Sequence, residues 1–123
     1  MPYAAYKLIH FLGIFTLIGA LIAAAMHVLR GGTRADDPYR RRLVAAHGIA
    51  AFLVLVGGFG MLARMGVLHG ALPDWVKVKL VLWVAVGAAI ALPYRGKGYA
   101  RLLLVGLPLL LLAAAAIALY KPF

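Results

Sequence analysis

The sequence of 123 residues contains no cysteine, serine, asparagine, glutamine or glutamate. Its only acidic residues are Asp36, Asp37 and Asp74, and its only threonines are Thr16 and Thr33. These absences exclude disulfides, thiolate metal sites, iron–sulfur clusters, carboxylate-bridged metal centres, and serine or cysteine nucleophiles. Any chemistry must use histidine, lysine, arginine, tyrosine or tryptophan, or a bound cofactor.

Charged residues are also scarce, at 13%, whereas 66% of the residues are hydrophobic and the mean hydropathy is +1.00. Soluble domains carry about a quarter charged residues, so this composition is typical of a membrane protein. Long apolar runs cross a bilayer as helices, because a strand exposed to lipid leaves its backbone without hydrogen-bond partners. We expect four spans, at about residues 3–29, 43–64, 75–92 and 101–120.

The connections between these runs are short, and short connections make consecutive helices antiparallel. The predicted fold class is therefore all-α, an integral membrane antiparallel four-helix bundle forming one domain over residues 1–123. Small residues are expected to let neighbouring helices approach closely at Gly19 and Ala23, at Gly57–Gly60 and at Gly87–Ala89. Pro93 is expected to end the third helix, whereas Pro108 lies within the fourth, where a kink is permitted but not required.

The formal net charge of +10 indicates the orientation of the chain. The first and third connections carry eight basic residues: Arg30, Arg34, Arg40, Arg41, Arg42, Arg95, Lys97 and Arg101. The opposite side carries five: Lys7, Arg64, Lys77, Lys79 and Lys121. The positive-inside rule then predicts a plasma or inner membrane protein with both termini outside, in the periplasm if the source is bacterial. The charge is explained by topology and by contact with anionic membrane lipids, and no soluble basic face exists for nucleic acid.

Two polar residues are expected near the outer end of the bundle. His10 lies about two turns into the first span, and Lys79 lies one turn after Trp75 in the third. A lysine within a span needs a partner or a cavity, so His10 and Lys79 are candidates for one shared pocket. In the alternative interpretation, Lys79 extends to the interface beside Lys77, and His10 is a hydrogen-bonded core residue.

A second, weaker candidate pair is His27 and His47, which lie at similar depth near the inner end. These two side chains are candidate ligands of a shared metal or haem iron. The alternative is that both are ordinary interfacial histidines. The 17 residues from His10 to His27 correspond to about 25 Å of helical rise, so one iron cannot join them. His69, in a connection between Gly66 and Gly70, is expected to be solvated.

Several of these residues occur in an order that resembles the HemJ-type protoporphyrinogen oxidases. The matching features are Lys7-Leu8-Ile9-His10 with Gly13, then Trp75 with Lys79-Leu80, and finally Pro108 with the tail Lys121-Pro122-Phe123. The related SirB-like and CopD-like membrane families share parts of the pattern, especially in the third helix. The resemblance extends loosely over nearly the whole chain and its four spans.

The resemblance implies a membrane protein that binds haem b or a porphyrin through His10, as an iron ligand, and Lys79. It also implies the oxidation of protoporphyrinogen IX, coupled to a membrane electron acceptor. The chain departs from the family where Val105-Gly106-Leu107 replaces an Asn-Glu before Pro108, and where alanines and His27 replace an arginine. We therefore expect cofactor binding with poor turnover of protoporphyrinogen, and no catalytic residue is assigned.

A different class of function is also compatible with the composition. Helices that are apolar all round, with small residues and interfacial aromatic residues, are typical of a non-catalytic subunit of a larger respiratory or photosynthetic complex. Other membrane subunits or further copies of the chain are then the expected partners. A transporter or channel is disfavoured, because no carboxylate lies within a span to relay protons or bind cations.

Overall fold

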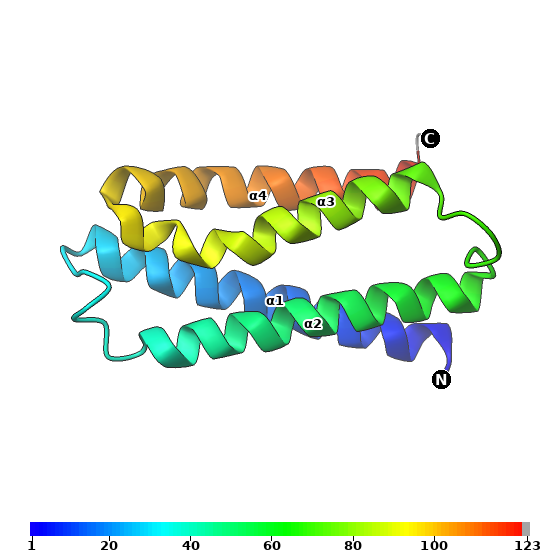
Figure 1. Ribbon diagram of the computed structural model, residues 1–123, viewed down its shortest axis with the longest axis horizontal. Helices are drawn as coiled ribbons and strands as arrows, with labels where there is room; N and C mark the ends of the chain where they lie inside the picture. Colours follow the sequence, from blue (N-terminus) through cyan, green and yellow to red (C-terminus); the bar gives the residue numbers. More distant parts are fainter. Residues whose placement is uncertain (122–123) are drawn as a thin grey trace.

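The computed structural model describes residues 1–121, which fold into four α-helices and two short 3₁₀ helices, with no strand among them. The α-helices are α1 (Tyr3–Leu29), α2 (Arg40–Met65), α3 (Asp74–Ala88) and α4 (Lys97–Tyr120), and the 3₁₀ helices are η1 (Ala89–Ala91) and η2 (Pro93–Arg95). Figure 1 shows the four α-helices side by side, with the N-terminus and the end of α4 at the same end of the molecule. The all-helical prediction is confirmed.

Three of the helices, α1, α2 and α4, are long and apolar enough to cross a membrane. Their outer faces carry large apolar side chains that no other part of the described chain covers, among them Leu8, Phe15, Phe52 and Leu112. Large contiguous apolar surface is unusual on soluble monomers, whereas lipid is its natural surrounding. The helix lengths and this surface are those of a membrane protein.

The buried core lies along α1, between α2 and α4. Its members are Leu17, Leu21, Ala25 and Val28 from α1, Ala50 and Ala51 from α2, Val86 from α3, and Ala100, Leu103 and Leu107 from α4. Pro108 follows Leu107 inside α4 without ending the helix. A proline inside a helix removes one backbone hydrogen bond, so α4 tolerates that loss within a continuous helix.

The closest approach between helices occurs where α1 crosses α2 at glycine positions. A Cβ atom added at Gly57 would lie 2.6 Å from the backbone nitrogen of His10 and 2.7 Å from the carbonyl oxygen of Tyr6. A Cβ atom at Gly13 would lie 2.7 Å from the carbonyl oxygen of Ala50. The predicted close approach is thus correct at Gly57, where any side chain would meet backbone rather than flexible atoms.

The same prediction is wrong at Gly19 and Gly87, because a Cβ atom at either position would have nothing within 4 Å. These two glycines point away from neighbouring helices rather than into a helix crossing. Spacing along the sequence identifies small residues, but only the packing of the helices decides which of them lie at a contact.

The third helix is shorter than the apolar run that predicted it, because its α-helical part ends at Ala88 and continues as η1. The carbonyl of Val86 accepts a hydrogen bond from the backbone N–H of Ala89 and another from Nε2 of His47, at 3.1 Å. Pro93 has no N–H for the carbonyl of Ala89, which accepts from Leu92 instead. These two effects tighten the end of the helix into 3₁₀ geometry.

The α3 helix packs loosely, since Val76 and Val86 are its only buried residues. Side-chain donors hold it to α2 at two points: His47 bonds to Val86, and Nε1 of Trp83 donates to the carbonyl of Ala51 at 2.8 Å. Both points lie in the second half of α3. Its first half, from Asp74 to Lys79, borders the cavity described next.

Candidate functional site

A cavity of about 140 Å³ lies between the first part of α1, the second part of α2, the start of α3 and the end of α4. It contains the two residues that the sequence predicted for a shared outer pocket, His10 on α1 and Lys79 on α3. The other lining residues are mostly apolar or aromatic: Tyr3, Val54, Leu55, Gly58, Phe59, Met61, Leu62, Met65, Trp75, Val76, Leu80, Trp83, Ala118 and Lys121. The walls are therefore apolar, with a few basic groups.

The imidazole of His10 is held by one hydrogen bond. Its Nδ1 lies 2.8 Å from the carbonyl oxygen of Val54 on α2. A carbonyl oxygen only accepts, so Nδ1 carries the hydrogen and donates it. In the neutral ring Nε2 then has a lone pair, and this is the tautomer in which histidines bind metals while Nδ1–H is held by the backbone.

Lys79 is half-buried and makes no ion pair with any carboxylate of residues 1–121. The alternative interpretation, in which Lys77 and Lys79 both extend outward, holds only for Lys77, which is exposed and lies 3.6 Å from Asp74. A lysine in an apolar wall needs either a charged partner or a cavity. Lys79 has no carboxylate partner and lies at the cavity, so it adds a basic group that no acidic residue neutralises.

A second lysine at the same cavity, Lys121, was not predicted as a site residue. Its Nζ lies 5.3 Å from the centre of the Trp75 ring and donates to the carbonyl of Ala118 at 3.0 Å. The end of α4 thus lies beside the start of α3, and the short connection between these two helices is the feature of the sequence that could have indicated it. No acidic residue lines the cavity, so its electrostatics favour an anionic ligand.

The volume of the cavity limits what it holds in this arrangement. A cavity of about 150 Å³ accommodates a molecule of the size of benzene, and a porphyrin macrocycle is several times larger. The donor set fits haem, because it combines a histidine Nε2 lone pair with apolar and aromatic walls and basic groups for carboxylates. The cavity is partly open to the surroundings of the chain, so a porphyrin held by His10 would extend beyond the space between the helices.

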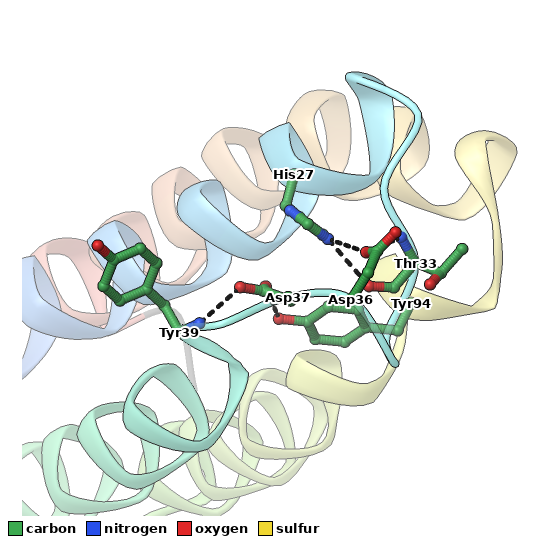
Figure 2. A network of polar contacts seen from close by, with 6 residues as sticks. All are labelled: His27, Thr33, Asp36, Asp37, Tyr39 and Tyr94. Atoms are coloured by element: carbon green, nitrogen blue, oxygen red, sulfur yellow. Dashed lines mark hydrogen bonds and ion pairs between the residues drawn. The ribbon is translucent and has the colours of Figure 1, made fainter.

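At the opposite end of the molecule, His27 is hydrogen-bonded to the connection between α1 and α2. Its Nε2 lies 2.8 Å from Oδ1 of Asp36 and 2.9 Å from the carbonyl oxygen of Thr33 (Figure 2). The backbone N–H of Thr33 donates to the same carboxylate oxygen at 2.6 Å. Hydrogen bonds from Thr33 and His27 hold the pKa of Asp36 below its ordinary value.

Asp37 ties this connection to η2. Its Oδ2 accepts a hydrogen bond from the hydroxyl of Tyr94 at 2.7 Å, and its Oδ1 accepts one from the backbone N–H of Tyr39 at 2.9 Å (Figure 2). Partial burial and the bond to Asp37 raise the pKa of Tyr94 above its ordinary value. The phenol therefore stays protonated, and the network joins two parts of the chain 57 positions apart.

The two histidines of the second predicted pair, His27 and His47, have different hydrogen-bond partners. His27 bonds to Asp36 and Thr33, whereas His47 is buried at 2% exposure and bonds through Nε2 to the carbonyl of Val86. Over residues 1–121 no three histidine or aspartate side chains come together in a way that could hold a metal ion. A haem site needs one or two ligands, so this finding bears on metal ions and not on haem.

Comparison of the chain with family models, with curated proteins and with solved structures finds no match. The resemblance to the HemJ-type proteins therefore rests on its motifs alone. Five residues of those motifs line the cavity: His10, Trp75, Lys79, Leu80 and Lys121. In the tail motif, residues 122 and 123 lie outside the part of the chain that the structure describes.

Proposed function

We propose that this protein is a small integral membrane protein that binds haem b or a porphyrin and takes part in membrane redox chemistry. The single observation that carries the proposal is the cavity shared by His10 and Lys79. Its histidine has the metal-binding tautomer, and its basic groups have no acidic neighbours in the lining. The resemblance to HemJ-type proteins points to the same two residues.

In this proposal His10 would hold the haem iron through Nε2, and the carbonyl of Val54 keeps the imidazole oriented. Lys79 would be either the second ligand or the partner of a propionate, and Lys121 would offer a second positive charge for the other propionate. The bound haem would supply one-electron transfer, tuned by its ligands and by the low polarity of the walls. The protein itself would bind and orient the haem and would exclude water from it.

The proposed setting is an antiparallel four-helix bundle in a plasma or inner membrane. The 15 residues of α3 and the three of η1 extend together about 28 Å, close to the ~30 Å of a hydrocarbon core. Basic residues outnumber acidic ones most strongly at the connections beside η2 and between α1 and α2. By the positive-inside rule these connections face the cytoplasm and the two ends of the chain face outside.

The proposed role is electron transfer or assembly rather than efficient protoporphyrinogen oxidation. Oxidising a porphyrinogen requires the removal of protons from several carbons, and therefore a base within reach. If His10 binds iron, its Nε2 no longer serves as that base. A strain without its own protoporphyrinogen oxidase should therefore grow poorly when this gene alone is supplied, and robust growth would restore the oxidase as its function.

A second candidate, a non-catalytic subunit of a larger membrane complex, is favoured by the outer face of α3. This helix buries only Val76 and Val86 and exposes Val81 and Val84 at 69% and 61%. A loosely packed helix with an apolar outer face suits contact with another membrane subunit or with a second copy of this chain.

The absorption spectrum of the purified protein separates the two candidates. A haem protein gives a Soret band and, in the reduced-minus-oxidised difference spectrum, sharp α and β bands. The protein should be produced with excess haem precursor and purified in a mild detergent, and a dilute haem titration should be run on the same sample. Absence of these bands in both the isolated and the titrated protein would contradict haem binding and favour the accessory subunit.

A further inference from the structure

A second hollow lies at the opposite end of the molecule from the His10 cavity. It is an open groove of about 680 Å³ between the end of α1, the connection that follows it and the start of α2. The residues that line it are Ala23, Met26, His27, Arg30, Asp37, Pro38, Tyr39, Arg42, Leu43 and Ala46. We call this hollow the Arg30–Arg42 groove.

Along α1 and α2, the lining of the Arg30–Arg42 groove changes from charged residues beside the connection to apolar residues further into the helices. Arg30 and Arg42 lie at the helix ends next to the connection, whereas Ala23 precedes Arg30 by seven residues, or about 10 Å of helical rise. Ala46 follows Arg42 by one turn, and Met26 and Leu43 lie between these levels. If α1 and α2 cross a membrane, this change runs from the headgroup layer towards the hydrocarbon.

The two arginines have no carboxylate partner within residues 1–121. The acidic groups at this end are Asp36, which pairs with His27, and Asp37, which accepts bonds from Tyr94 and from the backbone of Tyr39. Asp37 also faces the groove and reduces its positive potential, but two guanidinium groups outweigh this single carboxylate. The remaining positive charge is complementary to an anion. One guanidinium group can donate two parallel hydrogen bonds to two oxygens of a phosphate.

From the charged end and the apolar part of this lining we infer that the Arg30–Arg42 groove binds one anionic phospholipid. The phosphate lies against Arg30 and Arg42, and an acyl chain lies over the small side chains of Ala23 and Ala46. A free phosphate would satisfy the arginines but would leave the apolar part uncovered. The lipid assignment therefore depends on both halves of the groove, and it is independent of any haem at the other end.

The test measures lipid retained by the full chain in a neutral detergent, with native mass spectrometry as the readout. Phosphatidylglycerol is the anionic probe, phosphatidylcholine the zwitterionic one, and inorganic phosphate the soluble competitor. We expect one phosphatidylglycerol to remain bound and to resist phosphate. Equal retention of phosphatidylcholine, or displacement by an equimolar amount of phosphate, would overturn the assignment to an anionic lipid.

Two sets of variants locate the site. Arg30→Gln with Arg42→Gln should weaken phosphatidylglycerol binding by tenfold or more, since each basic group near a membrane surface strengthens binding by about fivefold. Arg95→Gln with Arg101→Gln removes the same charge from the same end but outside the groove, and should change binding less than threefold. Equal losses in both pairs would mean diffuse attraction and would contradict a built site.

The apolar half is tested without changing any charge. Ala46→Leu narrows the apolar part of the groove and should lower retention of phosphatidylglycerol, whereas Ala45→Leu, at an exposed neighbouring position outside the groove, should not. Circular dichroism of each variant checks that the helices remain intact. Unchanged retention in Ala46→Leu would show that only the headgroup is recognised and would overturn the proposed lipid path.

Discussion

Replacement of Gly57 by alanine tests the packing that supports His10. The added methyl group would lie 2.6 Å from the backbone nitrogen of His10, 2.7 Å from its Cβ and 2.7 Å from the carbonyl oxygen of Tyr6. Ordinary contacts of this kind are about 3.5 Å or longer. The backbones of α1 and α2 must therefore move apart by several tenths of an ångström or more.

Two opposing effects determine the magnitude. Overpacking of a tight contact costs about 1–3 kcal/mol, and the upper end applies here because two of the atoms met belong to the backbone. Alanine is favoured over glycine in a helix by about 1 kcal/mol. The expected net effect is a loss of about 2 kcal/mol in the free energy of unfolding, together with a longer bond between His10 and Val54.

The matched control is Gly48→Ala on the same helix, where an added Cβ would have nothing within 4 Å. This variant should be neutral or more stable than the wild type by up to about 1 kcal/mol. Both variants can be compared by titrating detergent-solubilised protein with sodium dodecyl sulfate and following helicity. If Gly57→Ala is as stable as Gly48→Ala, the close crossing of α1 and α2 is refuted.

Three further predictions concern the other end of the molecule and the topology. Tyr94→Phe removes a bond to the Asp37 carboxylate and should lower the free energy of unfolding by about 1 kcal/mol, since the site is only partly buried; Tyr99→Phe, at an exposed position, is the control and should have no effect. The lowered pKa of Asp36 means that its stabilising bonds are present above about pH 4 and are lost as the pH falls through the still lower pKa of the folded state. Amide exchange of Thr33 should accelerate over that acidic range beyond its intrinsic pH dependence, and a protection factor that stays constant down to pH 2 would contradict the interpretation. A reporter enzyme fused after Phe123 should be active only when exported, and activity confined to the cytoplasm would reverse the predicted orientation.

Much of the fold could be predicted from the sequence, because long apolar runs leave the backbone no alternative to helix. Counting helical turns along consecutive spans also predicted that His10 and Lys79 lie at the same depth in the membrane. In the structure both residues line the same cavity. This inference needed only the helical rise and the order of the spans, and both can be obtained without knowing any side-chain contact.

The details that were missed all depend on contacts between distant residues. At the end of the α-helical part of α3, the carbonyl of Val86 accepts a hydrogen bond from His47, which is 39 positions away in the sequence. His27 could not be assigned to Asp36, because the turn between them depends on Gly31 with a φ of 96°. A backbone angle of this kind follows from how the connection closes and not from the hydrophobic pattern.

The most direct test of the central claim is the pigment bound by the His10→Ala variant. His10 lines the cavity and is partly buried, whereas His69 is exposed in the connection between α2 and α3, so His69→Ala is the matched control. Both variants and the wild type should be purified together, and the Soret absorbance should be divided by the protein concentration. The account predicts wild-type pigment in His69→Ala and at least a tenfold loss in His10→Ala. Equal pigment in the two variants, or none in the wild type, would contradict it.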